Sequence, residues 1–118
     1  QYYEENKEEI LKKDRIYKQN RPAGIYSITC TENEKIYIGQ STSYHSRWSH
    51  HKSRAQRQCH ENPEFQKDWN KYGIDCFVFE LIEELPHDCT RESLIRKEAE
   101  QIKKMIREGR EIYNKINW

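Results

Sequence analysis

The apolar positions along the chain predict a β-hairpin and one further strand. Residues 24–30 and 35–39 alternate or run apolar with β-branched and aromatic side chains, and residues 31–34 between them favour a turn. Residues 75–82, which read DCFVFELI, form the most strand-like segment of the chain. We therefore expect this segment to be the central strand of a sheet, beside the hairpin.

Apolar positions spaced by three or four residues predict three helices after the hairpin. The first covers residues 44–58. The second follows Asn62-Pro63, which supplies an N-cap and a proline in the first turn, and it ends at Gly73. The third covers residues 91–107. Their apolar stripes are Tyr44, Trp48, His51 and Ala55 in the first, Phe65, Trp69 and Tyr72 in the second, and Leu94, Ile95, Ala99, Ile102, Met105 and Ile106 in the third.

A change of pattern near Pro22 predicts two parts. Residues 3–20 read as a charged helix with few apolar positions, and Arg21-Pro22 ends that pattern. We expect an N-terminal charged helix or linker over residues 1–21 and one domain over residues 22–118. The order of the elements predicts an α+β fold, in which a small, largely antiparallel sheet is covered by helices.

Composition narrows the class of protein. The 118 residues are 34% apolar and 35% charged with a net charge of +1, so the core must be small and the surface highly charged. No apolar run approaches the roughly 18 residues of a membrane span, and the amino end lacks the layout of a secretory signal. We expect no membrane partner and a cytoplasmic, intracellular location.

Positive charge is concentrated in residues 40–60. This segment holds four of the five histidines and no Asp or Glu. A local basic face predicts contacts with phosphates, and a solvated helix face is the alternative. Adjacent His50-His51 and Cys59-His60 also offer a zinc site, but the pairs lack the usual ligand spacing. The cations of the segment are Arg47, Lys52, Arg54 and Arg57.

Three placements suggest chemistry. Glu98 lies on the core-facing side of its predicted helix, where a carboxylate must be ion-paired, protonated or bound to a cation. Arg47 and His51, four residues apart on one helix, can hold one phosphate together. Tyr26 and Tyr37 can be neighbours on the hairpin, within reach of one ligand, although packing in the core or at its rim would also explain them.

In chain order, these residues resemble the motifs of the GIY-YIG nuclease family. The resemblance runs from about residue 23 to 116 and is greatest to the catalytic domains of phage group I intron homing endonucleases. It implies a three-stranded antiparallel sheet flanked by helices, with the N-terminal helix as an addition. The motifs are Gly24-Ile25-Tyr26, Tyr37-Ile38-Gly39, Arg47 with Trp48 and His51, Cys59-His60, Glu98 and Asn114.

The resemblance implies a metal-dependent endonuclease that hydrolyses phosphodiester bonds of double-stranded DNA. Glu98 would hold a single Mg²⁺ or Mn²⁺ ion, and Arg47 would stabilise the charge of the transition state. Tyr26 would be the general base, and Tyr37 would hydrogen-bond the phosphate or its water. Since the ordinary pKa of tyrosine is about 10, either nearby cations depress the pKa of Tyr26 or its proton is passed on, with His51 and Lys35 as helpers.

The remaining motif residues receive binding or structural roles. Lys35 and His60 join Lys52, Arg54 and Arg57 as expected DNA contacts, while Gly24, Gly39 and Asn114 are expected to support the fold. Some relatives carry lysine where this chain has Gln40. Because that lysine is absent here, we favour His51 as the acceptor of the Tyr26 proton. The alternatives are a restriction or structure-specific repair nuclease of the same family, or an inactive nucleic-acid-binding module. We also expect a separate DNA-binding domain in the full-length chain, and a host-cell location if a phage encodes it.

Overall fold

The computed structural model describes residues 23–86 and 88–115. The predicted helix over residues 1–21 lies outside this part of the chain. Three antiparallel strands form the sheet in the order β2-β1-β3. They are β1 (Ala23–Cys30), β2 (Ile36–Ser41) and β3 (Phe77–Leu85).

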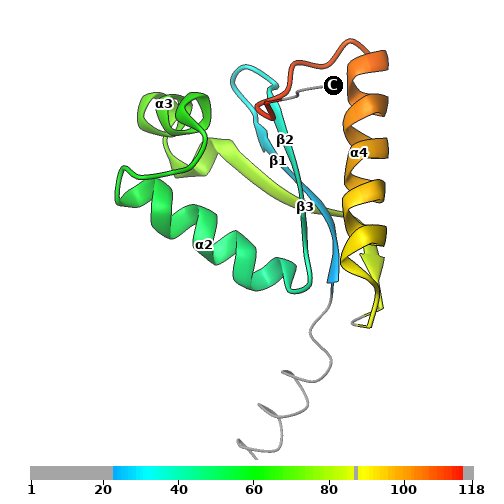
Figure 1. Ribbon diagram of the computed structural model, residues 1–118. Coiled ribbons are helices and arrows are strands. Elements are labelled where there is room, and N and C mark those ends of the chain that lie inside the picture. Colours follow the sequence, from blue (N-terminus) through cyan, green and yellow to red (C-terminus); the bar gives the residue numbers. More distant parts are fainter. Residues whose placement is uncertain (1–22, 87, 116–118) are drawn as a thin grey trace, which may run out of the picture.

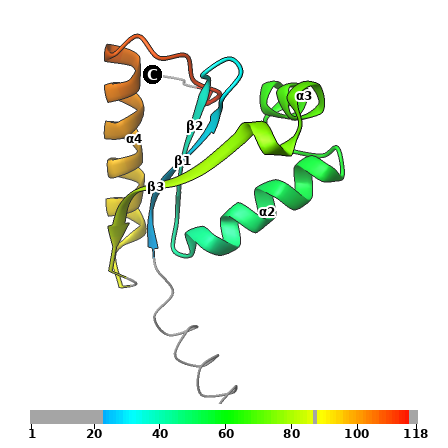
Figure 2. The ribbon, with the colours of Figure 1, turned by 180° about the vertical axis from the view of Figure 1, so that it is seen from behind.

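Helices cover both faces of this sheet. Helices α2 (Tyr44–Gln56) and α3 (Pro63–Tyr72) lie on one side, and α4 (Arg91–Arg107) lies on the other (Figures 1 and 2). A short 3₁₀ turn, η1 (Ile74–Cys76), joins α3 to β3. The predicted α+β fold with a three-stranded antiparallel sheet is therefore confirmed. Among the described residues, no helix combines the length and the apolar character needed to cross a membrane.

Local sequence sets where α3 and α4 begin and end. The Asn62 side chain accepts a hydrogen bond from the Phe65 N–H at 3.0 Å, and Pro63 opens the helix. The Thr90 hydroxyl accepts one from the Ser93 N–H at 3.1 Å at the start of α4. Gly73 ends α3 with φ of 88°, a conformation that strongly favours glycine.

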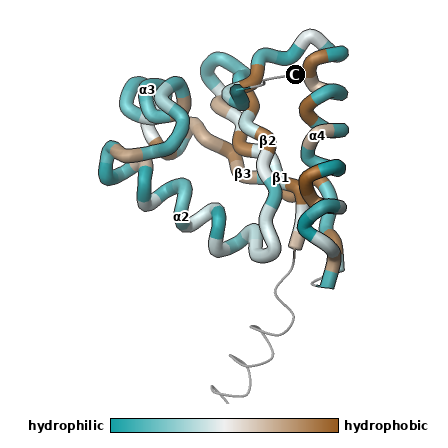
Figure 3. The backbone as a smooth tube through the Cα atoms, viewed as in Figure 1, coloured by the Kyte–Doolittle hydropathy of each residue, from teal (hydrophilic) through white to brown (hydrophobic). Residues whose placement is uncertain are grey.

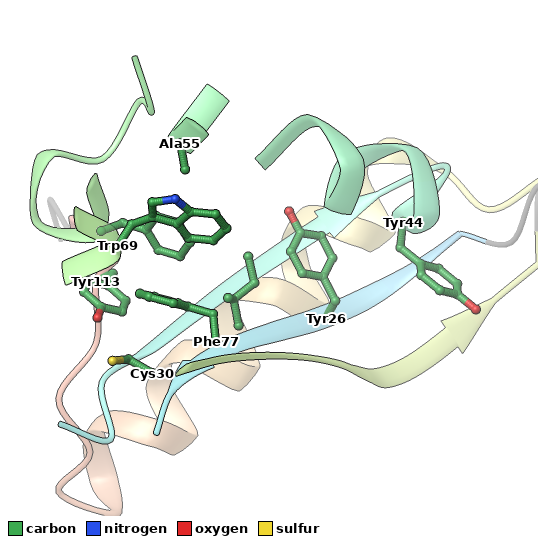
Figure 4. Packing of buried hydrophobic residues seen from close by; sticks show 9 residues of the cluster. Tyr26, Cys30, Tyr44, Ala55, Trp69, Phe77 and Tyr113 are labelled. Atoms are coloured by element: carbon green, nitrogen blue, oxygen red, sulfur yellow. The ribbon is translucent and has the colours of Figure 1, made fainter. Parts of the chain in front are cut away.

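Strand β1 lies between two apolar clusters. All but one of its residues are buried, because alternate side chains face opposite helical layers. Tyr26 and Ile28 point into the cluster under α2 and α3, whereas Ile25 packs with Leu94 and Ile102 of α4. Figure 3 shows this as apolar colour along the strands and the inner side of α4. Figure 4 shows the first cluster at close range.

The prediction that residues 75–82 form the central strand is wrong. Strand β3 is an edge strand, and β1 is central, with β2 and β3 on its two sides. Val78 and Ile82 of β3 are 39% and 36% exposed. Strand propensity reports how well side chains suit a pleated, half-buried surface, but it does not say which strands lie on either side, so it could not place this strand in the order.

The apolar stripe predicted for α4 is broader than the buried one. Leu94 and Ile102 are buried, but Ile95 and Ile106 are 52% and 47% exposed. The small sheet offers α4 only a narrow contact, so the outer members of the stripe remain in solvent.

Candidate active site

Tyr26 and Tyr37 lie on the face of the sheet that α2 and α3 cover. Tyr26 pairs with Gly39 and Tyr37 with Ile28, so the two phenols are diagonal neighbours on adjoining strands. Tyr26 is 1% exposed, and Figure 4 shows its hydroxyl turned towards α2. The hairpin thus brings together the two tyrosines of the paired motifs.

Helix α2 adds His51 and Arg47 to this pair. His51 is buried, and its Nε2 lies 2.8 Å from the Tyr26 hydroxyl in a hydrogen bond. The Tyr37 ring meets the His51 ring edge-on, with centroids 5.2 Å apart. The positive charge of Arg47 favours the ionised form of both phenols, and it therefore opposes the rise in their pKa that burial causes. One turn of helix therefore supplies an imidazole and a guanidinium to the same cluster.

His60 lies beyond His51 on the loop between α2 and α3. Its Nε2 is 2.8 Å from His51 Nδ1, and its ring stacks on Phe65 with centroids 4.2 Å apart. His60 was expected to contact DNA. The structure places its ring, half-buried, beside His51, and the contact with DNA stays a prediction.

Glu98 lies on α4, which covers the opposite face of the sheet. Its carboxylate is half-buried, and among the described residues no hydrogen bond or ion pair to it is found. Burial raises its pKa. Its charge also raises the pKa of Tyr26 and Tyr37, which places it within electrostatic range of both phenols.

Burial dominates the protonation of the cluster. It raises the pKa of Tyr26, as does neighbouring Tyr37, and Arg47 offsets only part of this rise. The depressed pKa that we considered for Tyr26 is therefore not found. Burial and the Arg47 charge lower the pKa of His51 to about 3, so this ring is neutral at pH 7.

Arg47 has an acidic neighbour that no sequence motif indicates. Glu61 lies 3.5 Å from the Arg47 guanidinium, in an ion pair that is partly open to solvent. Burial opposes the Arg47 charge, but the phenols and Glu61 together keep its pKa raised. Glu61 directly precedes the predicted N-cap of α3, and no motif of the sequence marked it.

Two glycines of the motifs make room for neighbours. A Cβ atom on Gly39 would collide with the Tyr26 ring, which lies directly over this residue. A Cβ on Gly24 would lie 2.6 Å from the Glu83 carbonyl, close to the irregularity in the β1–β3 pairing. Asn114 ties the chain after α4 to β2, since its side chain accepts from the Ile38 N–H at 2.9 Å and donates to the Ile38 carbonyl at 2.7 Å.

The other expected DNA contacts are spread over the surface. Lys35 lies at the hairpin turn, 3.7 Å from Glu64 and over the Tyr113 ring, and it is not among the charges that shift the Tyr26 pKa. Lys52 is exposed on α2 and Arg57 is exposed at the C-cap that follows it, whereas Arg54 of α2 is half-buried. The structure therefore brings together Tyr26, Tyr37, Arg47, His51 and His60, with Glu98 in electrostatic range, but leaves Lys35 outside this cluster.

The described residues give no support to a zinc site. In residues 23–86 and 88–115, no group of three or more His, Cys, Asp or Glu side chains could hold a metal ion. His51 uses both ring nitrogens in hydrogen bonds, one to Tyr26 and one to His60. A zinc ion would have to displace one of these partners.

Comparisons with known proteins identify a matching domain family and related sequences. The profile of the GIY-YIG catalytic domain matches residues 22–111. Over 83 residues the chain is 31% identical to Intron-associated endonuclease 1 of Enterobacteria phage T4, and the match covers 70% of the chain and 33% of that protein. It is 32% identical over 78 residues to Probable intron-encoded endonuclease 1 of Neurospora crassa, covering 66% of the chain and 24% of that protein.

A solved structure has the same fold. The catalytic domain of the homing endonuclease I-TevI superposes with a TM-score of 0.70 at 28% identity, covering 80% of this chain and 99% of that one. The chain thus spans about a third or less of the two curated relatives, but nearly all of this catalytic domain.

Proposed function

The chain belongs to the GIY-YIG family of catalytic domains, and from that premise we propose that it is the nuclease domain of a longer homing endonuclease that hydrolyses phosphodiester bonds in double-stranded DNA. The observation that carries the proposal is the convergence of Tyr26, Tyr37, Arg47 and His51 on one face of the sheet, within range of the Glu98 charge. The relatives named as intron endonucleases favour a homing enzyme over a restriction or repair nuclease.

Arg47 and the phenols are suited to a phosphate. The guanidinium is partly exposed, and its pKa is raised, so it remains charged and can meet the charge that builds up on the phosphate during attack. The DNA phosphate would compete with Glu61 for this guanidinium. Tyr37, which lies diagonal to Tyr26, would hydrogen-bond the phosphate or the attacking water, and Tyr26 would act on that water.

Glu98 fits a divalent cation. Members of the family generally depend on a divalent metal, and a half-buried carboxylate with a raised pKa and no cationic partner among the described residues has the chemistry of such a ligand. We propose that Glu98 holds a single Mg²⁺ or Mn²⁺. When bound, the ion would polarise the phosphate and stabilise charge on the departing oxygen.

A plasmid assay tests this function. The 118-residue chain, incubated with supercoiled plasmid and millimolar Mg²⁺, should yield nicked or linear DNA, and chelation by EDTA should stop the reaction. Glu98→Gln should remove cleavage because the amide is a poor ligand for a hard cation. Mg²⁺ should also raise the melting temperature of the parent and not that of the variant. Intact plasmid with the parent under these conditions would refute the proposal.

The stability of Glu98→Gln shows whether a loss of cleavage comes from unfolding of the variant. Because burial raises the pKa of Glu98, ionisation of this carboxyl costs folding free energy as the pH rises above its ordinary value of 4.5. Glutamine carries no such penalty. Urea denaturation should therefore find Glu98→Gln at least as stable as the parent at pH 7, with the difference shrinking towards pH 4. A variant much less stable than the parent at pH 7 would contradict this account of Glu98.

The whole protein is expected to hold more than this domain. The relatives are three to four times longer than their matched regions, which supports a separate DNA-binding domain in the full-length chain. We place the full-length protein inside the cell, where a DNA substrate is available.

A further inference from the structure

Four residues form one continuous chain of hydrogen bonds that ends on Tyr26. The backbone N–H of Asn62 donates to His60 Nδ1 at 3.0 Å. His60 Nε2 and His51 Nδ1 are 2.8 Å apart, and His51 Nε2 is 2.8 Å from the Tyr26 hydroxyl. Both ring nitrogens of both histidines are therefore engaged.

Only the first of these links has a direction fixed by covalent structure. A backbone N–H can only donate, so His60 Nδ1 must present its lone pair. A neutral imidazole carries one N–H, which on His60 must then be at Nε2 and must donate to His51 Nδ1. By the same count, the single proton of His51 is at Nε2 and is donated to the Tyr26 oxygen.

Charging either ring would break the chain. An imidazolium at His60 would point its Nδ1–H at the Asn62 N–H, and one at His51 would point its Nδ1–H at the Nε2–H of His60. His51 is 3% exposed, and burial lowers the pKa of both rings. The neutral, one-proton count therefore applies at pH 7.

The start of α3 fixes the position of the first link. The His60 backbone N–H donates to the Gln66 side chain at 3.0 Å, and the His60 ring stacks on Phe65. The Asn62 side chain accepts from the Phe65 N–H and donates to the Tyr113 carbonyl at 2.6 Å. The donor that sets the direction is thus held by several bonds and cannot easily rotate away.

We propose that the Asn62 backbone N–H and His60 are positioning groups, which hold His51 as a hydrogen-bond donor to the Tyr26 oxygen. The proposal rests on the nuclease function proposed above and replaces the expectation that His51 accepts the Tyr26 proton. In this arrangement the Tyr26 O–H points away from His51, and the His51 N–H stabilises the negative charge that the phenol oxygen carries when ionised.

Two substitutions of similar size test the direction. In His60→Gln the amide nitrogen can take the place of Nε2 and donate to His51 Nδ1. In His60→Glu the carboxylate can only accept, so it should pull the His51 proton to Nδ1 and leave Nε2 as an acceptor. The ¹⁵N NMR spectrum of the His51 ring reports which nitrogen carries the proton, and the plasmid assay reports cleavage.

In the parent and in His60→Gln we expect His51 protonated at Nε2, with cleavage by the Gln variant within about tenfold of the parent. In His60→Glu we expect protonation at Nδ1 and a loss of cleavage of roughly 10- to 100-fold, as for residues that orient a catalytic group. A His60 that only filled space would give equal losses in both variants.

A parent spectrum with the His51 proton at Nδ1 would overturn the proposal, whether or not the His60→Glu variant folds. Full cleavage by His60→Glu with the proton at Nδ1 would also overturn it, since the direction would then have no effect on catalysis. The spectrum is recorded without DNA. A parent that shows Nε2–H but leaves plasmid intact would therefore refute the nuclease function and still confirm the direction of the chain.

Discussion

Tyr26 is the residue on which the site geometry converges. Its ring lies over Gly39, its hydroxyl meets His51, and its edge faces Trp48 with centroids 6.3 Å apart. A buried ring so enclosed cannot shift without disturbing these contacts, because protein interiors are closely packed. Gly39 of the second motif therefore leaves the space that the ring of Tyr26, in the first motif, occupies.

Gly39→Ala should disturb this arrangement. The new methyl group would overlap the Tyr26 ring, and we expect a loss of stability of about 1–3 kcal/mol, typical of overpacking, together with reduced cleavage. Urea denaturation and the plasmid assay measure the two effects. Repeating the substitution in a Tyr26→Leu background, which lacks the ring, should recover most of the stability loss. Equal losses in both backgrounds would mean that the two residues do not interact in this way.

At the scale of elements, the start of α3 does more than begin a helix. Asn62 caps α3, joins it to the chain after α4 through Tyr113, and places His60 beside His51. Among the described residues, the side chain of Thr90, the N-cap of α4, bonds only to the Ser93 N–H, and Thr90 is more exposed than Asn62. The two caps therefore offer a matched comparison of a cap with tertiary contacts and one without.

Asn62→Ala should cost more stability than Thr90→Ala. Loss of a cap alone costs about 1 kcal/mol, which we expect for Thr90→Ala. Asn62→Ala also leaves the Tyr113 carbonyl without its donor in a buried position, which adds roughly 1–3 kcal/mol. Urea denaturation of both variants measures the difference. Equal costs would show that the bond to Tyr113 contributes nothing beyond the cap.

On the side of the sheet that α2 covers, the described residues offer only a few exposed cations to DNA. The net charge of the chain is +1, and within the described residues the exposed cations of α2 and its C-cap are Lys52 and Arg57, with Lys52 extended over the Phe79 ring at 4.8 Å. Phosphate contacts position a protein on DNA but do not read the sequence. An isolated domain of this kind should therefore bind DNA weakly and with little sequence preference.

The dependence of DNA affinity on salt concentration tests the expectation of weak binding. With about three phosphate contacts, DNA affinity should fall roughly 40-fold between about 50 and 200 mM salt. Fluorescence anisotropy with labelled duplex, in the absence of Mg²⁺, measures the slope. The double substitution Lys52→Gln and Arg57→Gln removes two phosphate contacts. The slope of log affinity against log salt concentration should therefore become shallower by about 1.8. A sub-nanomolar, sequence-specific complex at physiological salt would contradict weak binding by this domain.

Local structure was largely predictable from the sequence. The hairpin, the three described helices, the cap at Asn62 and the stop at Gly73 depend on periodicity and on residues a few positions apart. The hairpin pattern also made Tyr26 and Tyr37 candidate neighbours, but their shared face depends on the register of the two strands, which the structure gives. The helix over residues 1–21 and the division at Pro22 stay predictions.

What only the tertiary structure decided depends on which segments meet. Strand propensity could not show that β1 is central, nor could helical periodicity show that Ile95 and Ile106 remain exposed. Glu61 beside Arg47 and the His60–His51–Tyr26 chain join residues from different elements. The sequence by itself determined the elements and the chemical groups available to the site, since these are local properties. Their partners, their burial and the direction of their hydrogen bonds were set by packing, because those properties belong to contacts between segments far apart in the chain.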